Sequence, residues 1–318
     1  MSTSIILSGG HGGFDNKNPY ADLPLKFVVL LGKTCSSLAP LSEEINSHSM
    51  TITNNNELLV AGGCTGCTKG FKPSRICYVY KRNSWFLLST IYEFRLHSSI
   101  ITMPNGVYIF GGAKHPFPID SSEFLPNGCE EWQIGPKIPL QGTFGASGVA
   151  ISKDEILLSG GRGKVIDKML IFKISTNTWY TSNLNYGRCL HASFVYKDSV
   201  IICGGINRNR EIFNSTEILS LSDGSVKLGG NLNVPRRSHG MGVIDVGDGV
   251  SKLIAFGGFN DSQGSLSSIE EWNETAQKWE MSKLILPGPK RWGFAFCSSP
   301  NQHLRNSVTS KWQNLIPI

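Results

Sequence analysis

Short apolar runs recur along the chain, and each run ends at a pair of glycines. The runs are too short for helices and are typical of buried strands bounded by turns. They span residues 4–8, 58–61, 107–110, 156–159, 200–203 and 253–256. The glycine pairs that follow are Gly9-Gly10, Gly62-Gly63, Gly111-Gly112, Gly160-Gly161, Gly204-Gly205 and Gly257-Gly258. Successive pairs are 44 to 53 residues apart, which predicts six copies of one structural unit.

Each unit carries further β-rich segments around its glycine pair. A stretch such as 97–103 or 191–196 precedes the pair, and a second apolar stretch and a polar turn follow it. A tryptophan comes after the turn in four units: Trp85, Trp132, Trp179 and Trp279. Paired glycines allow a positive φ and close approach of a neighbouring chain, and a tryptophan buries a large apolar area between sheets. The pattern predicts four short strands per unit.

These glycine pairs and tryptophans resemble the repeat of kelch β-propellers, and the resemblance covers about residues 1–300. It implies that residues 1–299 form one all-β domain, a six-bladed kelch-type propeller with four antiparallel strands per blade. The stretch 289–297 matches the opening strands that begin at Arg95, Arg188 and Arg236. The resemblance implies that this C-terminal strand completes blade one. Residues 300–318 are left as a C-terminal tail, in which Trp312 either packs along the propeller or belongs to a mobile segment.

Composition places the chain among folded proteins. Of its 318 residues 40% are hydrophobic, which excludes intrinsic disorder. No apolar run reaches the ~18–20 residues that cross a bilayer, and the N-terminus lacks the features of a secretory signal. We therefore expect reduced cysteines, a cytoplasmic or nuclear location and no membrane association. The net charge of +6 is dispersed along the chain, so we expect no nucleic-acid partner.

Basic residues are predicted to gather on one rim of the propeller. The starts of the inner strands contribute Arg95, Arg188, Arg236, Arg237 and Arg291, and the loops after the glycine pairs contribute Arg162, Arg208 and Arg210. Guanidinium groups offer a planar fork of donors that suits carboxylates and phosphates. Reversal of Arg188 and Arg236 to glutamate is then expected to abolish partner capture and to leave the melting temperature nearly unchanged. The alternative is that an arginine before the inner strand is a structural part of the repeat.

Histidine and cysteine raise the question of metal or redox chemistry. His48, His97, His191 and His239 recur at matching positions, and we assign His97, His191 and His239 to the partner-binding rim. Strands of different blades hold these rings too far apart for ~2 Å ligation, so we expect no metal and no cofactor. Cys64 and Cys67 form a single C-x-x-C, which is either a reactive loop thiol or an incidental pair.

No catalytic constellation follows from residue spacing, so we expect no enzyme. The leading hypothesis is a monomeric protein-interaction scaffold or substrate-recognition module whose arginine-rich rim binds an acidic or phosphorylated segment of a protein partner. The resemblance makes actin or a ubiquitin-ligase component candidate partners, although a chain of this length, if complete, has no room for an N-terminal adaptor module. The alternative is a small-molecule enzyme of the sugar-acid mutarotase or epimerase type that uses the channel mouth.

Overall fold

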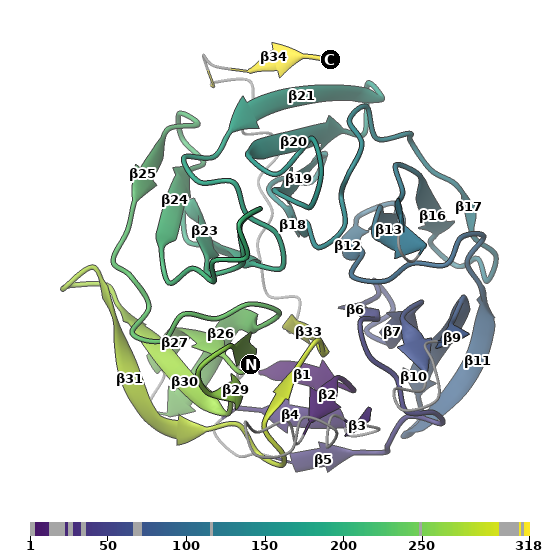
Figure 1. The fold of residues 1–318 in the computed structure, drawn as a ribbon. Helices are drawn as coiled ribbons and strands as arrows, with labels where there is room; N and C mark the ends of the chain where they lie inside the picture. The colour runs from purple at the N-terminus through teal and green to yellow at the C-terminus, as the bar shows by residue number, and fades with distance from the viewer. Residues whose placement is uncertain are drawn as a thin grey trace.

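All regular structure in the described part of the chain is β-sheet. The computed structural model describes residues 4–12, 23–24, 28–32, 36–65, 72–114, 117–247, 250–298, 312 and 315–318. Across these residues there is no helix, and hence none that could span a membrane. The sheets stand as wedges around a central axis, in the order in which the chain forms them (Figure 1). The protein is therefore an all-β propeller, as the sequence predicted.

Five sheets contain four antiparallel strands each. From the axis outward they are β33 (Ala295–Ser298), β1 (Ile5–Ser8), β4 (Val28–Leu31) and β5 (Ser36–Leu38); β6 (Ser49–Ile52), β7 (Leu58–Ala61), β10 (Ile76–Lys81) and β11 (Ser84–Thr90); β12 (Ser99–Met103), β13 (Gly106–Phe110), β16 (Ser122–Pro126) and β17 (Gln133–Ile134); β22 (Ala192–Tyr196), β23 (Ser199–Cys203), β24 (Thr216–Ser220) and β25 (Val226–Leu228); and β26 (Gly240–Gly247), β27 (Val250–Phe256), β30 (Ser268–Asn273) and β31 (Lys278–Ile285).

A further sheet has five strands, and here the predicted strand count is wrong. Its strands are β18 (Ser147–Ala150), β19 (Glu155–Ser159), β20 (Lys168–Lys173), β21 (Thr178–Asn183) and β34 (Ile316–Pro317). The C-terminal β34 pairs with the outer edge of β21, so this sheet gains a strand from the tail. The sequence predicted six blades with four strands each, whereas the structure has five four-stranded sheets and one sheet of five strands.

Small two- and three-stranded sheets follow the glycine pairs on one rim. They consist of β2 (His11–Gly12) with β3 (Leu23–Pro24) and β32 (Arg291–Trp292), β8 (Cys64–Thr65) with β9 (Lys72–Pro73), β14 (Ala113–Lys114) with β15 (Phe117–Pro118), and β28 (Phe259–Asn260) with β29 (Gly264–Ser265). These hairpins carry the loops that surround the candidate site.

The two ends of the propeller meet in one sheet. Strand β33 pairs antiparallel with β1, so that Ser298 lies opposite Ile5 and Ala295 opposite Ser8. The pairing confirms that the C-terminal strand completes the sheet begun by the first strands. It also covers an edge of β1 that would otherwise be free to pair with another chain.

The glycine pairs join neighbouring sheets. All twelve glycines have a positive φ, between 57° and 119°. In five of the six pairs the second glycine donates its N–H to a carbonyl oxygen at the start of the next sheet, as Gly161 does to Arg188 at 2.9 Å and Gly205 to Arg236 at 2.8 Å. A Cβ on the preceding Gly160 or Gly204 would collide with the same carbonyl oxygen. Only glycine therefore fits both the backbone conformation and the contact.

The predicted tryptophans fill the spaces between sheets. Trp132, Trp179 and Trp279 are buried in three separate apolar clusters, each built from neighbouring sheets. Trp312 is buried as well, packs against Leu221, and donates its Nε1–H to the Leu221 carbonyl oxygen at 3.2 Å. The described end of the tail is therefore packed, whereas residues 299–311 lie outside the described part of the chain.

Candidate functional site

Four of the arginines predicted to bind a partner are buried inside the sheets. Arg95, Arg188, Arg236 and Arg291 have no solvent-exposed surface. Three of them lie 2.8–2.9 Å from a buried carboxylate, in the pairs Arg95–Glu123, Arg188–Glu217 and Arg236–Glu270. Burial lowers the pKa of each of these arginines, and the neighbouring carboxylate opposes that effect. A guanidinium without exposed surface cannot reach a partner, so the prediction is wrong for these four residues.

The same hydrogen-bond network surrounds the arginine in three sheets. Arg188 shows the pattern, because its Nη1 donates to the carbonyl oxygens of Gly204 at 2.8 Å and Ser215 at 3.1 Å. Glu217 also accepts backbone N–H groups from Asn185 and Tyr186. A recurring Ser-x-Glu at 121–123, 215–217 and 268–270 marks this network in the sequence, and its glutamates were not among the predicted site residues.

Arg291 occupies the same place at the start of its strand but lacks the carboxylate. Val29, which pairs with Leu7, occupies the position that a glutamate holds in the three other sheets. Arg291 instead donates to the carbonyl oxygens of Pro289 and Pro287, both at 3.3 Å. Burial lowers its pKa to about 10. The residues just before its strand therefore bind the Arg291 guanidinium, which is not a surface group.

Three of the histidines connect neighbouring sheets. His48, His191 and His239 are buried at equivalent positions. The Nε2 atom of each contacts the residue that precedes a glycine pair, which is Ser8 at 2.7 Å, Ser159 at 2.8 Å and Cys203 at 3.5 Å respectively. Burial lowers the pKa of His48 to about 3 and those of the other two well below 6.5. The prediction that His191 and His239 bind a partner is therefore wrong.

His97 belongs to a different set of positions, one residue earlier in the unit. It is one of six residues that form a closed ring of backbone hydrogen bonds around the axis, each donating its N–H to the next carbonyl oxygen at 2.7–3.2 Å. In donor-to-acceptor order the ring runs Ser47, Gly293, Ser238, Leu190, Gly145 and His97, and returns to Ser47. Every member has a φ between 49° and 65°. The His97 side chain is partly exposed, and burial, His11 and Arg237 lower its pKa to about 3.

The remaining predicted arginines lie on the surface, in loops of adjacent sheets. We call the group Arg162, Lys164, Arg208, Arg210 and Arg237 the basic loop surface. All are exposed except Arg237, which is partly buried. Arg208 donates to the Gly163 carbonyl oxygen at 2.8 Å, so the loop after β23 is tied to the loop after β19. Among the described residues none of the five forms an ion pair within 4.0 Å.

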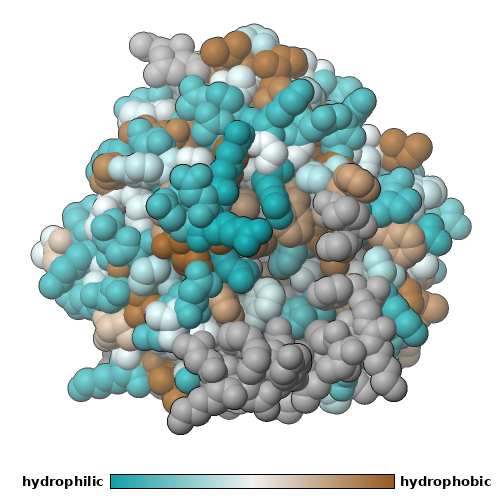
Figure 2. Space-filling view, in the orientation of Figure 1, coloured by the Kyte–Doolittle hydropathy of each residue, from teal (hydrophilic) through white to brown (hydrophobic). Residues whose placement is uncertain are grey.

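Arg237 extends this surface toward the axis. Its guanidinium lies over the rings of Phe259, at 4.6 Å, and Trp292, at 5.2 Å. Burial raises the pKa of Cys189 to about 11, and Arg162 and Arg237 oppose this effect. Figure 2 shows hydrophilic side chains around the centre of one face of the ring. An anionic group would find several unpaired donors there.

The central channel has a different chemistry. It is a cavity of about 760 Å³ lined by the innermost strands, and its lining within the described chain contains no Asp, Glu, Lys or Arg. The buried arginines point into the sheets and leave the channel uncharged. A carboxylate inside the channel would have no cation of the described lining to pair with, and the sugar-acid alternative, which uses the channel mouth, stays a prediction.

Metal and thiol chemistry find little support in the described residues. No cluster of three or more His, Cys, Asp or Glu side chains that could hold a metal ion occurs among them. Cys64 is buried, and its thiol contacts Asn46 Oδ1 at 3.0 Å. Cys67 lies outside the described residues, so the C-x-x-C stays a prediction.

No protein-family model matches the chain, and no curated protein matches it with significant similarity. The fold and the surface described above are therefore the basis for assigning a function.

Proposed function

We propose that the chain is a six-bladed propeller of the kelch type that acts as a protein-interaction scaffold or substrate-recognition module. Its basic loop surface binds an acidic or phosphorylated segment of a protein partner in the cytoplasm or nucleus. The observation that carries the proposal is the contrast between two groups of cations. The arginines of the sheets are buried with carboxylate or carbonyl partners, whereas Arg162, Lys164, Arg208 and Arg210 are exposed and form no ion pair within the described chain.

The geometry supports recognition of an extended anionic segment. The exposed cations lie on two tied loops, and Arg237 continues them toward the axis, so a peptide can contact several guanidinium groups at once. Charge-assisted, bidentate bonds from arginine give such a site both strength and orientation. Phe117, on the hairpin of β14 and β15, is 72% exposed and is a candidate apolar anchor for the same partner.

The test is charge reversal with a charge-matched control. Arg162→Glu/Arg208→Glu/Arg210→Glu changes the net charge from +6 to 0, and so does Arg82→Glu/Lys153→Glu/Lys227→Glu, which alters exposed cations outside this surface. Fluorescence anisotropy is measured with a glutamate-rich peptide, the same peptide with phosphoserines, and a neutral serine–glutamine peptide.

We expect the first variant to weaken binding of an anionic peptide at least tenfold and the control variant less than twofold. Raising the salt concentration should weaken the wild-type interaction as well, because exposed charges are screened. The comparison of the two anionic peptides decides between an acidic and a phosphorylated segment. Equal losses in both variants would show that only net charge matters and would reject the surface. Actin co-sedimentation and affinity capture then identify the partner.

A further inference from the structure

The central channel is lined by both hydroxyl groups and apolar side chains. Its volume of about 760 Å³ falls in the range of small-molecule sites, and all six innermost strands contribute to it. Strands β18 and β33 belong to sheets on opposite sides of the axis (Figure 1). Strands β6, β12 and β18 bring both hydroxyl and aliphatic side chains to the channel, and β22 and β33 add the aromatic rings of Phe194 and Phe296.

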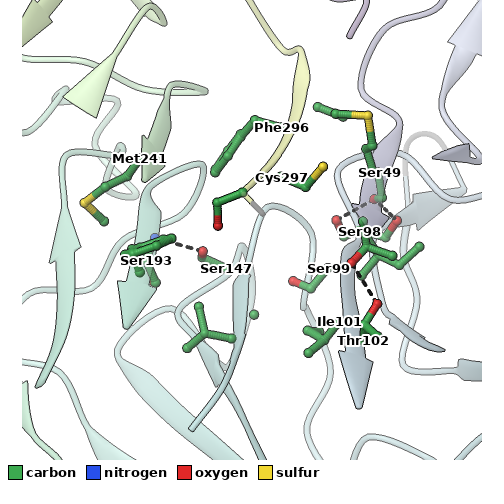
Figure 3. Close-up of a pocket in the computed structure, with 18 of the residues that line it drawn as sticks. Ser49, Ser98, Ser99, Ile101, Thr102, Ser147, Ser193, Met241, Phe296 and Cys297 are labelled. Carbon is green, nitrogen blue, oxygen red and sulfur yellow. Dashed lines mark hydrogen bonds between the residues drawn. The ribbon is translucent and has the colours of Figure 1, made fainter. Parts of the chain in front are cut away.

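The channel hydroxyls are organised by hydrogen bonds between neighbouring sheets. Ser49 Oγ and Ser98 Oγ are 2.8 Å apart, and Thr102 Oγ1 donates to the Ile52 carbonyl oxygen at 2.7 Å. Ser147 Oγ accepts the Ser193 N–H at 3.0 Å. Figure 3 shows these residues around the cavity. Because a hydroxyl has one hydrogen and two lone pairs, Thr102 keeps acceptor capacity, and Ser147 keeps both its hydrogen and a lone pair.

Aromatic and aliphatic side chains line the channel beside these hydroxyls, since Ser193 on the neighbouring strand β22 bonds directly to Ser147 on β18. Phe194 and Val195 on β22 and Phe296 and Cys297 on β33 all line the cavity and are partly exposed. Burial raises the pKa of the Cys297 thiol, which is therefore uncharged at neutral pH. In Figure 3, Phe296 and Cys297 lie between Ser193 on one side and Ser49 on the other. These four side chains offer contact area without strong hydrogen-bonding groups.

We propose that the channel binds a neutral small molecule that has an apolar face and several hydroxyl or N–H groups. The apolar face packs against Phe194 and Phe296, and the polar groups bond to the hydroxyls of Ser98, Thr102 and Ser147. The molecule is neutral because the described lining holds no charged side chain, and a buried charge without a partner is strongly disfavoured. The hydrogen-bonded ring that includes Gly145 and Gly293 narrows one end of the channel, so the ligand enters from the end near Asn54 and Pro104.

The site is separate from the basic loop surface and does not depend on the function proposed above. Its test uses isothermal titration calorimetry with two probes of equal size, phenyl β-glucopyranoside and phenyl β-glucuronide, which differ in a carboxylate. Ser147→Trp and Ala150→Trp each place a large ring in the channel from β18. Ile134→Trp serves as the control, since Ile134 is 86% exposed on an outer strand.

We expect the neutral glucoside to bind the wild type and the Ile134→Trp variant with the same Kd, and the anionic glucuronide at least tenfold more weakly. Each channel variant should weaken glucoside binding at least tenfold, and circular dichroism establishes which of them is folded. Three results overturn the proposal. The first is the absence of saturable glucoside binding, which would mean that the channel holds water only. The second is equal binding of both probes, and the third is unchanged binding in a folded channel variant.

Discussion

The guanidinium Nη2 of Arg236 lies 2.8 Å from Oε1 of Glu270, and neither side chain has any solvent-exposed surface. Removal of one partner leaves the other charge buried and uncompensated, at a cost of about 3–5 kcal/mol. We therefore predict that Arg236→Met and Glu270→Gln each lower the free energy of unfolding by about that amount. Urea denaturation of the purified variants measures it.

The control for this prediction is a surface arginine. Arg210→Met removes an exposed cation and should change the free energy of unfolding by less than about 0.5 kcal/mol. The sequence alone led to the opposite expectation, namely that reversal of Arg188 and Arg236 leaves the melting temperature unchanged. Melting temperatures of Arg236→Met and Arg210→Met that agree with each other would support that earlier expectation and contradict the structural role.

Buried histidines should make stability fall in mild acid. The pKa of His48 is about 3 in the folded protein and near 6.5 in the unfolded chain, because burial disfavours the charged ring. Between these values the unfolded chain binds more protons, so stability is complete above pH 6.5 and is lost as the pH falls. At pH 5.5 the loss from one such histidine is about 1.4 kcal/mol.

The measurement is urea denaturation at pH 7.5, 6.5 and 5.5 for the wild type and for His48→Gln. The variant loses the Ser8–His48 contact and is expected to be less stable at pH 7.5, but its stability should decrease less between pH 7.5 and 5.5. This window avoids the titration of ordinary carboxyl groups, which protonate at lower pH. Parallel pH profiles for the two proteins would show that His48 does not titrate as described.

The sequence predicted the features that repeat locally and missed those that depend on distant partners. Each glycine pair and each tryptophan is a local requirement of one residue type, so the unit and its packing could be predicted. The burial of Arg95 and Arg236 depends on Glu123 and Glu270, which follow at different separations of 28 and 34 residues. Without that pairing, an arginine at the start of a strand looks like a surface group.

The position of His97 was missed for another reason. The ring that it joins is made by backbone groups, so its members Ser47, Leu190 and Gly145 have no side-chain feature in common. Aligning the units by their histidines therefore placed His97 one residue away from its true equivalents. Such a ring can be identified from φ angles and hydrogen bonds, but not from residue types.

The glycine pairs allow backbone strain to be separated from steric contact. Gly160 has a φ of 58°, and a Cβ there would collide with the Arg188 carbonyl oxygen and lie 2.9 Å from His191 Cε1. Gly128 has a φ of 77° and has no atom within 4 Å of a Cβ. We predict that Gly128→Ala costs about 1–2 kcal/mol, from strain alone, whereas Gly160→Ala costs clearly more or prevents folding.

Thermal denaturation of the two alanine variants, side by side, checks this prediction. If both variants melt at the same temperature, the contact across the sheets contributes nothing beyond strain. The link between the glycine pair and the next sheet would then have to rest on the hydrogen bond from Gly161 alone.

Trp312 should anchor the end of the chain to the propeller. Its ring is 8% exposed, belongs to the apolar cluster that contains Leu221, and leaves no room for a Cβ on Gly224, which would lie 2.6 Å from Cδ2. Trp312→Ala is predicted to lower the free energy of unfolding by about 3–5 kcal/mol, the usual cost of removing a buried tryptophan. Ile316→Ala, at a residue 60% exposed on β34, should cost less than about 1 kcal/mol. Gly224 has a φ of 75°, so Gly224→Ala should cost about 1–2 kcal/mol from strain in Trp312→Ala, and clearly more in the wild type, where its Cβ also displaces the ring. Chemical denaturation of these variants and of the double variant measures the coupling, and additive losses would show that Trp312 does not occupy this site.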